Sequence, residues 1–170
     1  MNQLQSFIFK IIINIFKIDK IEEFYLNSVI RYGILNYVAK YSLAKDNYLI
    51  TSECFEYLNT KKLISDKGLR RGLKSKKNKF TYEHPIPSNI IADELFKNRN
   101  DINKMKKILV WSDIVTIITS REDEVLSKKY VSKMPNNWKF FNGNKFERYK
   151  LCGLENPPTN KIKVFGAVKR

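Results

Sequence analysis

A run of positive charge between Lys61 and Lys79 divides this chain of 170 residues. The run holds nine lysine or arginine side chains and one acid, a net charge of +8, which is more than half of the +15 of the whole chain. Gly68 and Gly72 argue against a continuous helix here. Like charges at this density repel one another unless an anionic partner neutralises them. We therefore expect a connecting arm that binds nucleic acid through Lys67, Arg70, Arg71, Lys74, Lys76, Lys77 and Lys79.

The region before this arm, residues 1–60, is expected to be helical. Residues 3–18 form an apolar stretch in which Lys10, Asn14 and Lys17 give one narrow polar stripe at helical spacing. Such a helix must be buried on most of its sides, in the core or at the seam of a homodimer. Further helices are expected over residues 22–45 and 48–64, the latter with Thr51 or Ser52 as its N-cap.

The region after the arm mixes strands and helices. A short strand is expected over residues 80–82 and a clearer one over the β-branched residues 114–118, followed by a helix over 121–130 that Thr119 or Ser120 caps, with Asp123 completing a variant of the capping box. Helices over 89–97 and 102–109 are expected between these strands, capped by Ser88 and Asp101, and a last strand over 161–168. Trp138, Phe140 and Phe141 are expected to pack onto the core. The prediction is an α+β protein with a helical region (1–60), a basic arm (61–79), a small strand–strand–helix unit (80–155) and a tail (156–170).

His84 is the only histidine of the chain, and it lies between Glu83 and Pro85. The proline disfavours a helical conformation for the residue before it, so His84 is expected at the end of an extended segment. Any acid–base chemistry of an imidazole in this protein must use His84. The alternative interpretation is a surface histidine in a proline-rich turn.

The order of strand, Glu83-His84, strand 114–118 and capped helix resembles the HNH, or ββα-metal (His-Me finger), nucleases. The resemblance covers roughly residues 80–130 and implies that His84 is the general base, with Glu83 as the first metal ligand. Asp113 would stand where the family has an asparagine that orients the histidine. Asp123 or Glu124 would complete the metal site. The paired zinc-binding cysteines of many members are absent, because Cys54 and Cys152 are far apart in sequence.

The activity that this resemblance implies is metal-dependent hydrolysis of phosphodiester bonds by an endonuclease, with DNA favoured over RNA. Carboxylate ligands favour Mg²⁺ or Mn²⁺ over Zn²⁺. Arg121, at the start of the helix, is the candidate for contacting the scissile phosphate. A restriction or phage-defence role would suit a compact, basic nuclease.

Three alternatives stay open from the sequence. The chain could be a DNA- or RNA-binding protein without catalysis, a metal-independent ribonuclease toxin that uses His84, or a membrane-surface protein that uses its first helix. The first apolar stretch, broken by two lysines and an asparagine, is too short to span a membrane. A cytoplasmic protein with two free thiols and no stable membrane association is the expectation.

Overall fold

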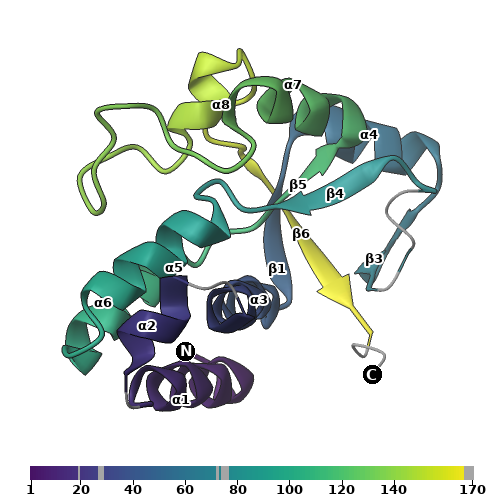
Figure 1. Cartoon of the computed structure of the whole chain (residues 1–170). Coiled ribbons are helices and arrows are strands. Elements are labelled where there is room, and N and C mark those ends of the chain that lie inside the picture. The colour runs from purple at the N-terminus through teal and green to yellow at the C-terminus, as the bar shows by residue number, and fades with distance from the viewer. Residues whose placement is uncertain (19, 27–28, 72, 74–76, 167–170) are drawn as a thin grey trace. The chain divides into compact units, whose positions relative to one another are not determined.

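The computed structural model describes residues 1–18, 20–26, 29–71, 73 and 77–166, drawn in colour in Figure 1. The chain forms two compact units. The helical unit contains residues 1–44 and 86–113, and the sheet unit contains residues 45–85 and 114–170. Helices and a mixed sheet are both present, which confirms the predicted α+β class and its N-terminal helices. The units differ from the predicted regions, because residues 86–113 belong with the N-terminal helices while residues 45–60 belong with the sheet.

The helical unit consists of α1 (Gln3–Phe16), α2 (Ile21–Leu26), α3 (Val29–Leu43), α5 (Ser88–Lys97) and α6 (Ile102–Ser112). Asn2 caps α1 and forms a capping box with Gln5, and Asp101 caps α6 as expected. Helix α3 packs against α1, α2 and α5, and α5 packs against α6. The core of this unit contains aliphatic side chains of these helices, among them Ile12, Ile34, Val38, Ile91, Leu95, Met105 and Ile108.

Helix α1 is less buried than its sequence predicts. It buries Ile8, Phe9, Ile12 and Phe16, but Phe7 is 61% exposed. The expectation of burial on most sides is therefore wrong for this helix within its own unit, since one face alone packs on α3. A homodimer seam stays a prediction. No helix in the described ranges is long and apolar enough to cross a membrane.

Within the described residues, the sheet unit contains six strands in the order β2-β3-β6-β1-β5-β4. They are β1 (Asn47–Ile50), β2 (Ile64–Ser65), β3 (Gly68–Arg70), β4 (Phe80–Glu83), β5 (Thr116–Thr119) and β6 (Asn160–Phe165). The pairs β1–β5 and β3–β6 are parallel, and the other pairs are antiparallel. Strand β1 was not predicted from the sequence, and β2 and β3 were expected inside a connecting arm, whereas the start of that run is part of the sheet.

Three helices complete the sheet unit: α4 (Ser52–Thr60), α7 (Ser120–Tyr130) and α8 (Glu147–Leu151). Strands β1 and β5 run directly into α4 and α7, through the N-caps Thr51 and Thr119. Helix α7 packs against β4 and β5, so the predicted order of strand, strand and helix is confirmed, although residues 86–113 of the helical unit separate the two strands in sequence. The capping box of α7 pairs Thr119 with Glu122, one residue earlier than predicted. Both cysteines are free; Cys54 is buried and Cys152 half-buried.

Candidate functional site

A buried arginine holds the end of β4, where Glu83 and His84 lie. Arg148, on α8, is 2% exposed, and its guanidinium forms an ion pair with the carboxylate of Glu83. Its Nη2 donates to the carbonyl oxygen of His84 at 2.6 Å, and its Nε donates to that of Pro85 at 3.0 Å. Its Nη1 donates to the carbonyl oxygen of Tyr130 at 2.7 Å, at the end of α7. One guanidinium therefore fixes three successive residues, 83–85, and ties them to two helices.

Tyr149 completes this arrangement, which we call the Arg148 clamp (Glu83, Arg148 and Tyr149). The Tyr149 hydroxyl donates to Oε2 of Glu83 at 2.6 Å. Burial raises the pKa of Glu83, although the positive charge of Arg148 and the hydrogen bonds of both partners oppose the shift. Burial, with the charge of Glu83, also raises the pKa of Tyr149 well above its ordinary value. Tyr149 is therefore a neutral donor at every pH at which the protein would act.

Asp123 on α7 is part of the same electrostatic environment. It is half-buried, and burial raises its pKa while the charge of Arg148 opposes the shift. Its own charge contributes to the raised pKa of Glu83. The structure thus brings together Glu83, His84, Asp123 and Arg148, whereas Glu124 is exposed.

A metal site at this place finds little support in the donor set. One carboxylate oxygen of Glu83 accepts a hydrogen bond from Arg148, and the other accepts one from Tyr149. The guanidinium of Arg148 already neutralises the negative charge that would attract a divalent cation. Within the described ranges, no three His, Cys, Asp or Glu side chains form a group that could hold a metal ion. Glu83 therefore does not fit the role of a first metal ligand in this conformation, and a Mg²⁺ or Mn²⁺ requirement stays a prediction.

Two other predicted residues have side-chain partners within their own units. Asp113 follows α6 in the helical unit, where one of its carboxylate oxygens accepts a hydrogen bond from Gln5 at 2.9 Å. Arg121, 73% exposed, forms an ion pair with Glu53 of α4. This pairing lowers the pKa of Glu53 and raises that of Arg121.

Glu122 joins the first turns of α4 and α7 and is 3% exposed. Its Oε2 accepts hydrogen bonds from the hydroxyl of Thr51 at 2.8 Å and from the backbone N–H of Thr119 at 2.8 Å. Because an anion is favoured at a helix N-terminus, this carboxylate is stabilised by both helices. It is an internal structural anion, and it fixes the parallel strands β1 and β5 at the ends where their helices begin.

Five of the seven predicted nucleic-acid-binding residues are described by the structure, and four of these five are exposed. Lys67, Arg70, Lys77 and Lys79 are exposed. Arg71 is half-buried, donating to the hydroxyl of Tyr48 at 3.0 Å and to the carbonyl oxygen of Lys45 at 2.8 Å. The structure therefore gives Arg71 a role in joining the sheet, in place of the predicted surface position. Lys74 and Lys76 lie outside the described residues.

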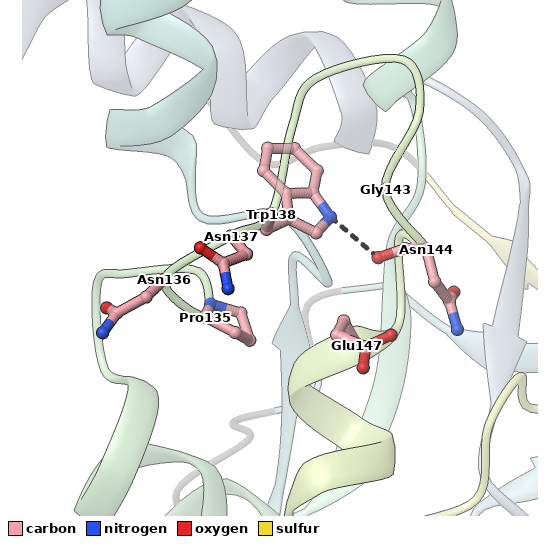
Figure 2. A pocket seen from close by; sticks show the side chains of 7 residues that line it. All are labelled: Pro135, Asn136, Asn137, Trp138, Gly143, Asn144 and Glu147. Atoms are coloured by element: carbon pink, nitrogen blue, oxygen red, sulfur yellow. Dashed lines mark hydrogen bonds between the residues drawn. The ribbon is translucent and has the colours of Figure 1, made fainter.

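The loop between α7 and α8 forms a pocket that was not predicted from the sequence. Residues 135–138, 143, 144 and 147 surround a volume of about 300 Å³ (Figure 2). Trp138 and Phe140 are half-buried, whereas Phe141 is 39% exposed, so the expectation of packing onto the core does not hold for Phe141. The signal in the sequence was the run of lysines, asparagines and aromatic residues from 133 to 146, which is too polar for a core segment.

No protein-family model matches this sequence, no curated protein matches it, and no solved structure matches the chain. Function must therefore be argued from the geometry of the site itself.

Proposed function

We propose that this protein is an endonuclease that hydrolyses phosphodiester bonds of DNA, with His84 as the general base. The observation that supports this proposal is the Arg148 clamp, which holds the side chain of Glu83 and the carbonyl oxygens of His84 and Pro85. The clamp lies at the end of a strand paired with β5 and packed under α7. Active sites require reacting groups held rigidly by a surrounding shell of hydrogen bonds.

The chemistry proposed for His84 is proton removal from the attacking water. The water oxygen bonds to phosphorus, its proton passes to the imidazole, and the bond from phosphorus to the leaving oxygen breaks. A histidine can accept this proton near neutral pH. Arg148 is too buried to reach a phosphate and is a positioning residue, which holds the carbonyl oxygens of His84 and Pro85.

Substrate binding is assigned in this proposal to the exposed basic side chains between residues 67 and 79. Lys67, Arg70, Lys77 and Lys79 are exposed. If these four side chains neutralise about four phosphates, the slope of log affinity against log salt concentration would be roughly −4 for duplex DNA. Replacing these four residues with alanine should weaken binding and make the slope less negative by about one for each phosphate that is no longer neutralised. A restriction or phage-defence role would follow from such an activity.

The test is cleavage of supercoiled plasmid by the wild type and by His84→Ala, each with Mg²⁺, with Mn²⁺ and with EDTA. We expect cutting by the wild type that disappears in the variant and returns in part when imidazole is added. Circular dichroism checks that the variant is folded. A folded wild-type protein that shifts DNA in a gel but never cuts it would overturn the nuclease proposal and support a non-catalytic DNA-binding protein.

A metal-independent ribonuclease is the second candidate, and one observation favours it. The carboxylate next to His84 is neutralised by a guanidinium, which is a poor arrangement for binding a cation. In that mechanism His84 would take the proton of a ribose 2′-hydroxyl, whose oxygen attacks phosphorus. The bond from phosphorus to the 5′-oxygen of the next nucleotide breaks, and that oxygen gains a proton from water. Cleavage of RNA in EDTA that leaves 2′,3′-cyclic phosphate ends would select this candidate over the metal-dependent DNA endonuclease.

A further inference from the structure

The open pocket between α7 and α8 combines one aromatic side chain with several polar ones. Its volume of about 300 Å³ lies at the lower end of the range for small-molecule pockets. Figure 2 shows the indole of Trp138 at one end, with Pro135 and Asn137 on one side and Glu147 on the other. A flat aromatic surface with amide and carboxylate groups around it is suited to a flat, polar, aromatic ligand.

The Trp138 indole is fixed before any ligand arrives. Its Nε1 donates a hydrogen bond to the carbonyl oxygen of Asn144 at 2.9 Å. The Asn144 side chain is itself used by the loop, since its Oδ1 accepts from the backbone N–H of Phe146 at 2.9 Å. Gly143 lets the chain approach the ring, because a Cβ at this position would lie only 2.4 Å from the Trp138 Nε1. A stacking surface that is already ordered loses little conformational entropy on binding.

The polar groups of the pocket are those that recognise the edge of a nucleobase. Asn136 and Asn137 each carry an amide with two donors and an acceptor, the group that pairs with the N6 and N7 atoms of adenine. The carboxylate of Glu147 accepts hydrogen bonds from an exocyclic amino group. No purely apolar ligand would offer partners to these three side chains.

The surroundings of the pocket are those of a surface that binds single strands. Phe140 contacts Trp138 edge to face, with ring centroids 5.5 Å apart, and Phe141 contacts Phe140 in the same way at 5.2 Å. Phe141 is 39% exposed. Its φ of 67° lies in the left-handed region, which bulky residues rarely adopt and which is found most often at functional sites. Lys133 and Lys139 are exposed on the same loop. Aromatic side chains between lysines combine base stacking with phosphate contacts.

The pocket is joined to the candidate active site by the chain itself. Glu147, which lines the pocket, directly precedes Arg148, which holds Glu83 and His84. We propose that this pocket takes one unpaired nucleobase of the nucleic-acid strand whose phosphodiester is presented to His84. This proposal rests on the proposed nuclease function for its substrate class. Holding one base by stacking on Trp138 would fix the position of the strand relative to His84.

The experiment measures nucleotide binding without any cleavage. In a Trp111→Phe background, Trp138 is the only tryptophan, so its fluorescence reports on the pocket. The protein is titrated with AMP, GMP, CMP and UMP, and with ribose 5-phosphate as a control that lacks a base. We expect quenching by at least one nucleotide and none by ribose 5-phosphate. Equal responses to ribose 5-phosphate and to the nucleotides would overturn the proposal, because the pocket would then bind sugar or phosphate.

Variants locate the binding. Asn137→Ala and Gly143→Ala should each weaken nucleotide binding by about 5- to 150-fold, the range expected when a base loses a hydrogen-bond partner or a stacking surface. Asn142→Ala is the matched control, because Asn142 is exposed on the same loop and does not line the pocket. Unchanged binding in both pocket variants would overturn the assignment. The unmodified chain is measured in parallel by anisotropy of a labelled single strand.

The two proposals fail in different ways. Nucleotide binding that depends on Asn137, with no cleavage of any nucleic acid, supports the pocket and overturns the nuclease. Cleavage that depends on His84, with no nucleotide binding at the loop, supports the nuclease and overturns the pocket.

Discussion

Arg148 and Glu83 form a buried ion pair that joins α8 to the end of β4. The arginine side chain is 2% exposed and that of the glutamate 12%. Every nitrogen of the guanidinium donates a hydrogen bond: to Glu83 itself or to a carbonyl oxygen of His84, Pro85 or Tyr130. A buried charge is tolerated when it is paired and hydrogen-bonded in this way. The ion pair therefore couples the stability of the sheet unit to the position of His84.

Arg148→Met should destabilise the protein by about 3–5 kcal/mol, because it leaves the Glu83 carboxylate buried without its partner. Urea unfolding followed by circular dichroism measures the change. Adding Glu83→Leu to this variant should restore part of the loss, since the orphaned charge is then gone. Arg121→Ala is the control, because it breaks an ion pair in which the arginine is exposed, and should leave the unfolding midpoint nearly unchanged. A loss of stability in Arg148→Met as small as that in Arg121→Ala would refute the structural role of the clamp.

The elements of this fold that sequence predicts best are those with a local chemical signal. Asp101 predicts the start of α6, and Thr51 predicts the start of α4, because each side chain caps its own helix. The β-branched residues before Thr119 predict β5. Strand β1 gave a weaker signal, because Asn47–Ile50 has only four residues and leads directly into α4. Only its pairing with β5 and β6 makes it a strand.

Only the part of the candidate site that is local in sequence was predicted. Glu83 and His84 are adjacent, so the sequence shows them together. Arg148 and Tyr149 are more than 60 residues away, and nothing local indicates that they hold Glu83. Asp113, which the sequence places just before a strand, ends α6 in the helical unit, and its suggested role toward His84 stays a prediction. Contacts between distant segments are set by the tertiary fold, and one sequence does not reveal them.

Thr51→Val should destabilise the protein by about 1–2 kcal/mol. The change removes the N-cap of α4 and takes one donor from the buried carboxylate of Glu122. Thr51→Ser keeps the hydroxyl and is the matched control, expected to lose less stability than Thr51→Val. Thermal unfolding of the three proteins at one pH gives the comparison. A loss for Thr51→Val no larger than that for Thr51→Ser would contradict the stabilising role of the hydroxyl and of its hydrogen bond to Glu122.

The two thiols should differ sharply in reactivity. Cys54 is fully buried, and burial together with the charges of Glu122 and Glu53 raises its pKa to about 12, so almost none is thiolate at pH 8. Cys152 is half-buried. With a disulfide reagent at pH 8, we expect one thiol to react in the native protein and two in urea. The folded Cys152→Ser variant should not react with the reagent, whereas the folded Cys54→Ser variant should still react at one thiol. Fast labelling of Cys54 in the folded chain would contradict its burial.

Two glycines should respond to alanine with opposite signs. Gly33 lies inside α3, and a Cβ there would meet nothing within 4 Å. Gly33→Ala should therefore stabilise the protein by up to about 1 kcal/mol, because alanine restricts the unfolded chain and favours a helix. Gly68 begins β3 with a φ of +102°, and its Cβ would lie 2.1 Å from the carbonyl oxygen of Lys163 on β6. Gly68→Ala should destabilise by at least about 1–3 kcal/mol, from backbone strain and from the forced separation of β3 and β6. Urea unfolding of both variants beside the wild type measures the two signs, and a neutral Gly68→Ala would mean that β3 does not pair with β6 as the structure has it.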